Sequence, residues 1–270
     1  MSRAAFYTLA ILVILWSIMP FLWQFLTSVK PAAQLTLLPP LLPESLDLSH
    51  YPRVFIERPF GRYMINSLVV ASATTIFSLL IASLAAYALA RMPFPGRGMV
   101  LGLILSVSMF PAIATVSPLF LLIRKLALRD NLLALILTYT TFTLPLGTWI
   151  LTNFFREIPQ DLERAAIIDG CTPLQALFRV FFPLALPGIS TAAILIFIFA
   201  WNEFLFALTF TTTEASRTIP VGIALFPGIY EVPWGEIAAA SVIVTLPLIV
   251  VVLILQRRII GGLTAGALKG

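Results

Sequence analysis

Residues 63–90 read YMINSLVVASATTIFSLLIASLAAYALA and contain no Asp, Glu, Lys or Arg. A helix needs about 20 apolar residues to cross the hydrocarbon core of a bilayer, and this stretch is long enough. Five more stretches of at least 20 residues lack these charges, namely 4–29, 98–123, 131–155, 180–202 and 237–256. The sequence therefore predicts an all-α membrane protein with six transmembrane helices.

The composition agrees with a membrane protein and excludes several other classes. Of the 270 residues, 60% are apolar and 11% are charged, whereas about a quarter of an ordinary soluble domain is charged. A soluble fold needs surface charge to stay dissolved, so a soluble enzyme, a disordered protein and a disulfide scaffold are excluded. A transmembrane β-barrel would show segments of about 10 residues with alternating polarity, and runs such as residues 9–16 do not alternate.

The spans are expected to form one transmembrane domain over residues 1–270. We place them at residues 6–28, 63–90, 98–122, 131–155, 186–209 and 237–256. The first is interpreted as a retained helix, because no small-x-small cleavage site follows it. The main connections are residues 156–186, on the side of the termini, and 211–236, on the opposite side. The uncharged residues 218–230 are too short and too rich in Pro and Gly to span, so they are expected at the membrane surface.

The motifs of common catalytic and metal sites are absent from the sequence. It contains no Walker A loop, no GxSxG, no GxGxxG and no cluster of metal ligands. Cys171 is the single cysteine, which excludes an internal disulfide. His50 has no second ligand nearby and is interpreted as a surface loop residue. We predict no catalytic residue and no metal site, and any nucleotide energy would have to come from another subunit.

The distribution of basic residues gives only a weak orientation. With six spans both termini lie on one side, which would hold nine Lys and Arg residues against eight on the other. The positive-inside rule counts these residues in short loops, so the difference decides little.

The connection over residues 156–186 has the pattern of a short helix. Asp161 and Glu163 suit the positive N-terminal end of a helix, and Gly170 is a natural stop. Thr172 and Gln175 then form the pattern of a capping box for a second helix, with a proline between them. The spacing alone fits an ordinary amphipathic connecting helix equally well.

Residues 162–170, LERAAIIDG, together with the later Phe-Pro and Pro-Gly pairs, resemble the EAA motif of binding-protein-dependent ABC importer permeases. The resemblance implies that residues 161–171 form a coupling helix, which docks in a groove of a cytoplasmic ATPase. The implied coupling residues are Asp161, Glu163, Arg164, Ala165, Ala166, Asp169 and Gly170. Arg164 replaces the glutamate of E-A-A, while Glu163 before it is retained. This departure leaves open which acidic residue, if any, pairs with a basic residue of the ATPase.

Other segments extend the resemblance to most of the chain. Residues 200–204, AWNEF, are similar to the W-N-[DE] run of sugar permeases, and residues 256–270 to the tail of the maltose-permease G-type family. The resemblance implies a type I ABC importer permease fold without an ATPase site of its own. It also implies a multi-pass protein of a bacterial or archaeal cytoplasmic membrane, surrounded by lipid, with both termini in the cytoplasm.

The same resemblance implies the partners and the class of substrate. The partners are a second permease subunit of six to eight spans, an ATPase dimer that binds ATP and Mg, and an extracellular or periplasmic sugar-binding protein, with no role for nucleic acid. The expected substrate is a disaccharide such as maltose or trehalose. The alternatives are another sugar, a polyol or glycerol phosphate, or a self-contained secondary transporter. Such a transporter would need more intramembrane ionisable residues than this sequence has.

Three further groups of residues are expected to make contacts in such a transporter. The substrate path is assigned to Tyr139, Trp201, Asn202, Glu203 and Phe206, the contact with the binding protein to Phe226, Pro227, Gly228 and Tyr230, and the contact of the tail with the ATPase to Gly262, Leu263, Thr264 and Gly266. Glu203 is the only charge within an apolar span, where a carboxylate costs at least about 2.5 kcal/mol. It is expected either to line the path or to be hydrated near the end of a tilted span.

Overall fold

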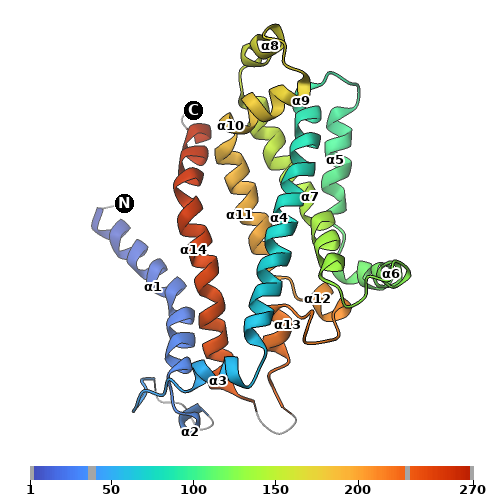
Figure 1. The fold of residues 1–270 in the computed structure, drawn as a ribbon. Coiled ribbons are helices and arrows are strands. Elements are labelled where there is room, and N and C mark those ends of the chain that lie inside the picture. The colour runs from blue at the N-terminus through green and yellow to red at the C-terminus, as the bar shows by residue number, and fades with distance from the viewer. Residues whose placement is uncertain (1–2, 36–40, 229–231, 268–270) are drawn as a thin grey trace. The chain divides into compact units, whose positions relative to one another are not determined.

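The computed structural model describes residues 3–35, 41–228 and 232–267, and for 255–267 the backbone only. Every regular element in these residues is a helix (Figure 1). The longer helices are α1 (Arg3–Ser28), α4 (Phe60–Arg91), α5 (Arg97–Val107), α6 (Ala112–Lys125), α7 (Leu132–Glu157), α11 (Leu186–Asn202) and α14 (Trp234–Ala267). The shorter ones are α2 (Ala32–Leu35), α3 (His50–Ile56), α8 (Gln160–Ile168), α9 (Pro173–Ala176), the π-helix Leu177–Phe181, α10 (Phe182–Leu184), α12 (Leu205–Phe210) and α13 (Ile219–Ala224).

The described helices include enough long apolar segments for a multi-pass membrane protein. Four are long and apolar enough to cross a bilayer by themselves: Ala5–Ser28, Phe60–Arg91, Leu132–Glu157 and Trp234–Ile254. Two pairs, Arg97–Val107 with Ala112–Lys125 and Pro173–Leu184 with Leu186–Asn202, bend by 88° and 83°, and counting each pair as one span raises the number to six. The predicted all-α membrane fold is confirmed.

Two segments expected as continuous spans contain breaks. Between α5 and α6 the chain turns at Pro111, which has extended backbone (ψ 124°) and no N–H to continue the helix. Helix α6 consequently runs across the direction of α5 (Figure 1). The segment 186–209 is divided as well, because α11 ends at Asn202 and α12 begins at Leu205.

The chain forms two compact units, each with its own core. One comprises Met1–Met64 and Ile219–Pro247, and the other Ile65–Thr218 and Leu248–Gly270. In the second unit, α4, α7 and α11 pack through small, aliphatic and aromatic residues, which include Ala82, Ile189 and Phe155. Helices α7 and α11 approach so closely that a Cβ on Gly188 would lie 2.4 Å from Cδ2 of Phe154.

The first unit is held together around a buried histidine. The ring of His50 is 3% exposed, and its Nε2 is 2.9 Å from the main-chain oxygen of Lys30. A Cβ on Gly235 would lie 2.4 Å from Cε1 of this ring, so the helix α14 begins directly against it. The interpretation of His50 as a surface loop residue is therefore wrong, because His50 begins α3 and its ring is buried against Lys30 and Gly235.

In the second unit, Asp130 joins the turn before α7 to the segment after α12. Its carboxylate accepts hydrogen bonds from the main-chain N–H groups of Thr212 (2.7 Å) and Thr213 (3.0 Å), from the Thr213 hydroxyl (2.6 Å) and from the Ser216 hydroxyl. Its own N–H donates to the Phe210 oxygen at 2.8 Å. Burial raises the pKa of Asp130, but the hydrogen bonds to Ser216, Thr213 and Thr212 outweigh it and hold the pKa well below its usual range.

This arrangement predicts a pH-dependent contribution of Asp130 to stability. Because the folded pKa lies below the unfolded value of about 3.9, the carboxylate stabilises the folded protein above that value and ceases to as the pH falls through the folded pKa. We expect Asp130→Asn to lower the midpoint of thermal unfolding in detergent at pH 7, with a difference from the parent protein that narrows below about pH 4. The exposed Glu214→Gln in the same segment is the control. A difference that does not change with pH would contradict this account.

Candidate functional site

Helix α8, in the segment between α7 and α11, is defined by clear signals at both ends. It begins after Pro159, with Asp161 and Glu163 in its first turn, where acidic side chains favour the helix dipole. At its other end Gly170 has a φ of +84°, its N–H donates to the Ile167 oxygen (3.0 Å), and the next N–H donates to the Ala166 oxygen (2.9 Å). This is a Schellman motif, and it ends the helix at Ile168, before the limit of 171 expected from sequence.

The capping box that follows has the geometry predicted from sequence. The Thr172 hydroxyl accepts a hydrogen bond from the Gln175 N–H (3.3 Å), and the Gln175 side chain accepts one from the Thr172 N–H (2.9 Å). The chain then continues through the π-helix and α10 and bends by 83° into α11. Helices α8 and α9 lie beyond the ends of α4 and α7 (Figure 1). The segment between α7 and α11 thus projects as the short helix α8, followed by a capped second helix, α9.

The residues assigned to the coupling helix divide between two faces of α8. On the inner face, Ala166 is 6% exposed, and the Glu163 carboxylate accepts a hydrogen bond from the Tyr87 hydroxyl (2.7 Å). On the outer face, Asp161 and Arg164 form an ion pair of 3.5 Å with side chains 91% and 70% exposed. The remaining members, Ala165, Asp169 and Gly170, are also exposed. The structure therefore brings five of the seven residues to the surface and turns two inward.

Sequence analysis missed the residue against which α8 is held. Arg91 ends α4, and its side chain is 5% exposed, with Nε at 3.8 Å from Glu163 Oε2. Its position directly after the charge-free stretch 63–90, one helical turn beyond Tyr87, was the available signal. The contact itself could not be predicted, because Glu163 lies 72 residues further along the chain and two residues so far apart form no local sequence pattern.

Three of the residues assigned to the substrate path are packed within the second unit. The ring of Tyr139 is fully buried with its centroid 6.4 Å from that of Phe199. The other two stack on aromatic neighbours: Trp201 on Phe197 at 5.6 Å and Phe206 on Phe142 at 5.0 Å. Asn202 is exposed, and its side-chain amide donates to the Ile198 oxygen at 2.8 Å.

Glu203 lies between α11 and α12 and hydrogen-bonds the first N–H groups of α12. Its backbone is extended (ψ 129°), and its carboxylate oxygens accept hydrogen bonds from the N–H groups of Phe206 (2.9 Å) and Ala207 (3.1 Å). These are free donors at the start of α12. A carboxylate in an apolar segment is thereby satisfied by a helix N-terminus, a contact that sequence analysis did not predict.

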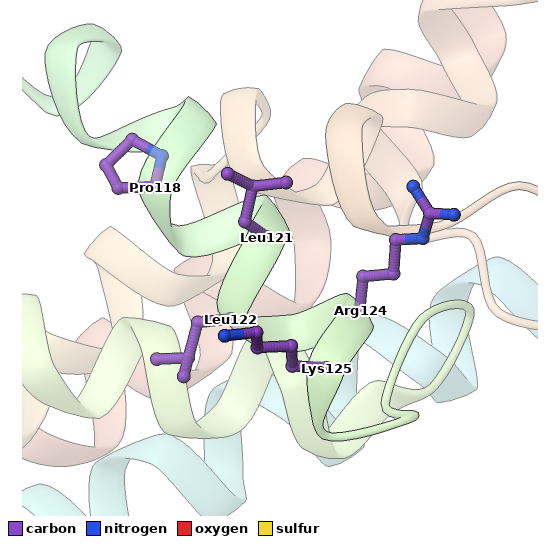
Figure 2. A pocket seen from close by; sticks show the side chains of 5 residues that line it. All are labelled: Pro118, Leu121, Leu122, Arg124 and Lys125. Carbon is purple, nitrogen blue, oxygen red and sulfur yellow. The ribbon is translucent and has the colours of Figure 1, made fainter.

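Two depressions lie along α6, in the second unit. The larger has a volume of about 560 Å³ and is lined by Pro118, Leu121, Leu122, Arg124 and Lys125 (Figure 2). The smaller has a volume of about 350 Å³ and is lined by Val116, Ser117, Phe120, Leu121 and Thr209. None of the five residues assigned to the substrate path lines either depression. Within the described part of the chain, no group of three or more His, Cys, Asp or Glu residues is arranged to bind a metal.

The residues assigned to the contact with the binding protein and to the contact of the tail with the ATPase are only partly described. Phe226 is 1% exposed, and the Arg58 guanidinium both donates to its oxygen (3.1 Å) and lies over its ring (5.2 Å). Pro227 and Gly228 are exposed, while Tyr230 lies outside the described residues. The tail residues lie in the last turns of α14, where only the backbone is described: Gly262, Leu263, Thr264 and Gly266.

With several candidate membrane-spanning helices and a short helix projecting between two of them, the protein belongs to the class of multi-pass helical membrane proteins. Residues 78–264 match the family described as binding-protein-dependent transport system inner membrane component. The chain belongs to this family, and it is an ABC transporter permease subunit.

The relatives support this assignment over nearly the whole chain. The trehalose transport system permease protein SugB of Mycobacterium tuberculosis is 46% identical over 271 residues, which cover 99% of this chain and 98% of that protein. The sulfoquinovosyl glycerol transport system permease protein SmoH of Agrobacterium fabrum is 46% identical over 252 residues, covering 93% and 88%. A crystal structure of a bacterial ABC transporter involved in import of the acidic polysaccharide alginate aligns with a TM-score of 0.81 and 25% identity, covering 95% and 98% of the two chains.

The contacts of Glu203 predict how its variants differ. Glu203→Ala removes both acceptors at the start of α12, so we expect a loss of about 0.5–2 kcal/mol in the free energy of unfolding. Glu203→Gln keeps an amide oxygen as acceptor and should lose less. Denaturant unfolding in detergent measures both. If neither variant changes stability but both abolish transport, Glu203 acts on the transported substrate and not as a cap.

Proposed function

We propose that this chain is a transmembrane subunit of an ATP-driven sugar importer, with residues 1–270 acting as one transmembrane permease domain. It forms half of the translocation path and works by alternating access. The observation that carries the proposal is helix α8, which is held on its inner face by the hydrogen bond between Glu163 and Tyr87 and leaves its outer face exposed. A helix held in this way transmits a push from a partner to the helices beneath it.

Helix α8 is proposed to dock on a cytoplasmic ABC ATPase dimer that binds ATP and Mg. This orientation puts both termini in the cytoplasm and agrees with the slight excess of basic residues on that side. The outer face combines an apolar tip, with Ile168 84% exposed, and the charges of Asp161 and Arg164. The tail residues 262–266 are proposed to contact the same partner.

The inward position of Glu163 affects which acidic residue of α8 can pair with a basic residue of the ATPase. Since Glu163 is hydrogen-bonded to Tyr87, the exposed carboxylates of Asp161 and Asp169 are the better candidates to pair with a basic residue of the ATPase. Arg164 is exposed as well and favours an acidic residue on the partner. We therefore propose that the groove of this ATPase carries charges of both signs.

The proposed substrate is a small glycoside, such as the disaccharides trehalose or maltose. Trehalose and sulfoquinovosyl glycerol, named for the two relatives, are both small glycosides. Sulfoquinovosyl glycerol carries a sulfonate, so the relatives support a glycoside of either neutral or anionic character. The predicted spans contain no Lys or Arg to pair with an anion, and for this chain we propose a neutral disaccharide. A second permease subunit would complete the path, to which this chain would contribute the exposed Asn202, directly before the break between α11 and α12.

A sugar-binding protein is proposed to dock on the extracellular or periplasmic side. The exposed Pro227 and Gly228, with Tyr230, are the proposed contact of this chain. The buried Phe226 would then hold the segment in place and leave the contact to its neighbours.

The coupling function is tested by variants at the end of α8. Gly170 has a φ of +84°, so Gly170→Ala places an L-residue in a left-handed conformation at a cost of about 1–2 kcal/mol. We expect Gly170→Ala and Asp169→Asn to leave the protein in the membrane but to lower sugar uptake per ATP hydrolysed about tenfold. The measurement is uptake and ATP hydrolysis by the complete transporter in proteoliposomes.

The control is Gly102→Ala in α5, because a Cβ there meets nothing within 4 Å. It should leave both rates unchanged. Normal coupled uptake by both the Gly170 and the Asp169 variants would refute the proposed coupling role.

A further inference from the structure

Arg91 binds the end of α7. Its Nη2 donates hydrogen bonds to the main-chain oxygens of Phe155 (2.6 Å) and Ile158. The last carbonyls of a helix have no partner within the helix, and the helix dipole favours a cation there. The guanidinium therefore fixes the end of α4, which carries it, to the end of α7.

The same guanidinium contacts the segment that leads into α11. Its Cζ lies 4.7 Å from the centroid of the Phe181 ring, in the π-helix, and this ring also meets those of Tyr87 (5.2 Å) and Phe155 (5.8 Å) edge-on. A planar guanidinium can stack on a ring and donate in its own plane at once, whereas an ammonium cannot. The side chain, which α4 carries, thus joins the end of α7 to the π-helix in the segment before α11.

The fourth contact of Arg91 is incomplete. Its Nε has no hydrogen-bond partner among the described residues although it is buried, and it faces Glu163 Oε2 at 3.8 Å. A charge-assisted hydrogen bond needs about 2.7–2.9 Å, so an inward shift of α8 by about 1 Å would form it. The Tyr87 hydroxyl donates a hydrogen bond to Glu163 Oε1 (2.7 Å) and so keeps the carboxylate directed at Nε of Arg91.

We propose that Arg91 is a positioning residue that passes the movement of α8 to α4, α7 and the segment before α11. When a partner presses on the outer face of α8, Glu163 moves onto Nε of Arg91 and closes the ion pair. When the partner withdraws, the pair opens to the distance seen here. The proposal rests on the proposed coupling function of α8, and it assigns to Glu163 an internal role that needs no contact with the ATPase.

The proposal is tested in the complete transporter in proteoliposomes. We expect Arg91→Gln and Glu163→Gln each to lower sugar uptake per ATP hydrolysed about tenfold while the ATPase still co-purifies. The double variant should lose no more than either single variant, because both remove the same interaction. Arg91→Lys should not restore coupling, since it keeps the charge but not the fork of donors.

Two further variants separate positioning from folding. Arg156→Gln changes an exposed arginine at the same end of α7 and should behave as the parent protein. Tyr87→Phe removes only the hydroxyl that aims Glu163, so it should fold normally and still lower uptake per ATP hydrolysed. This variant keeps the proposal testable if loss of Arg91 prevents assembly.

Several outcomes would overturn the proposal. These are normal uptake per ATP hydrolysed by Tyr87→Phe or Glu163→Gln, additive losses in the double variant, or full rescue by Arg91→Lys. If the Gly170 and Asp169 variants uncouple the transporter but these do not, only the role of Arg91 is refuted. If the Gly170 and Asp169 variants also transport normally, the coupling function of α8 falls as well.

Discussion

A break in a helix leaves main-chain N–H and C=O groups without partners, and the bilayer interior supplies no water to satisfy them. At three helix ends of the second unit, a side chain or a glycine supplies the missing partners. Glu203 binds two N–H groups of α12, and Gly170 lets the last carbonyls of α8 accept from the residues that follow. Arg91 binds the carbonyls at the end of α7. The arrangement of the second unit depends on these few polar contacts, because its apolar surfaces alone would not specify where the helices stop.

The sequence predicts those features that depend on neighbours along the chain. The charge-free stretches mark the long helices, and the capping box of Thr172 and Gln175 is read correctly because its partners are three residues apart. Contacts between distant residues leave no such pattern: Glu163 meets Tyr87 across 76 positions, and Asp130 meets Ser216 across 86. The hydrogen bonds of Glu203 to α12 were not predicted for another reason, since a glutamate is an uncommon cap and apolar segments suggest a continuous span. His50 was misjudged because a polar loop was taken to be exposed, whereas its ring is buried.

The break between α11 and α12 changes what this chain can offer to a substrate. Aromatic residues chosen for their chemistry, Tyr139, Trp201 and Phe206, are occupied by contacts with neighbouring rings. Broken helices are a recurring feature of transport paths, because they expose polar main chain and side chains where an intact helix would not. Here the exposed amide of Asn202 stands directly before the break. The polar contribution of this chain to a path is therefore better sought at the break than among the buried rings.

The two faces of α8 are subject to different physical constraints. The inner face must fit Tyr87 and Arg91 of the same chain, so the charge of Glu163 is fixed by a buried cation whose removal from water is costly unless it is paired. The outer face carries Asp161 and Arg164 in an exposed ion pair, which contributes little to stability, so its charges can follow those of a partner. The departure from the E-A-A pattern falls at Arg164, on the outer face, and the retained glutamate falls on the inner one. A glutamate retained on the inner face and a residue changed on the outer face are what we expect if contacts within the chain constrain the first and contacts with a partner constrain the second.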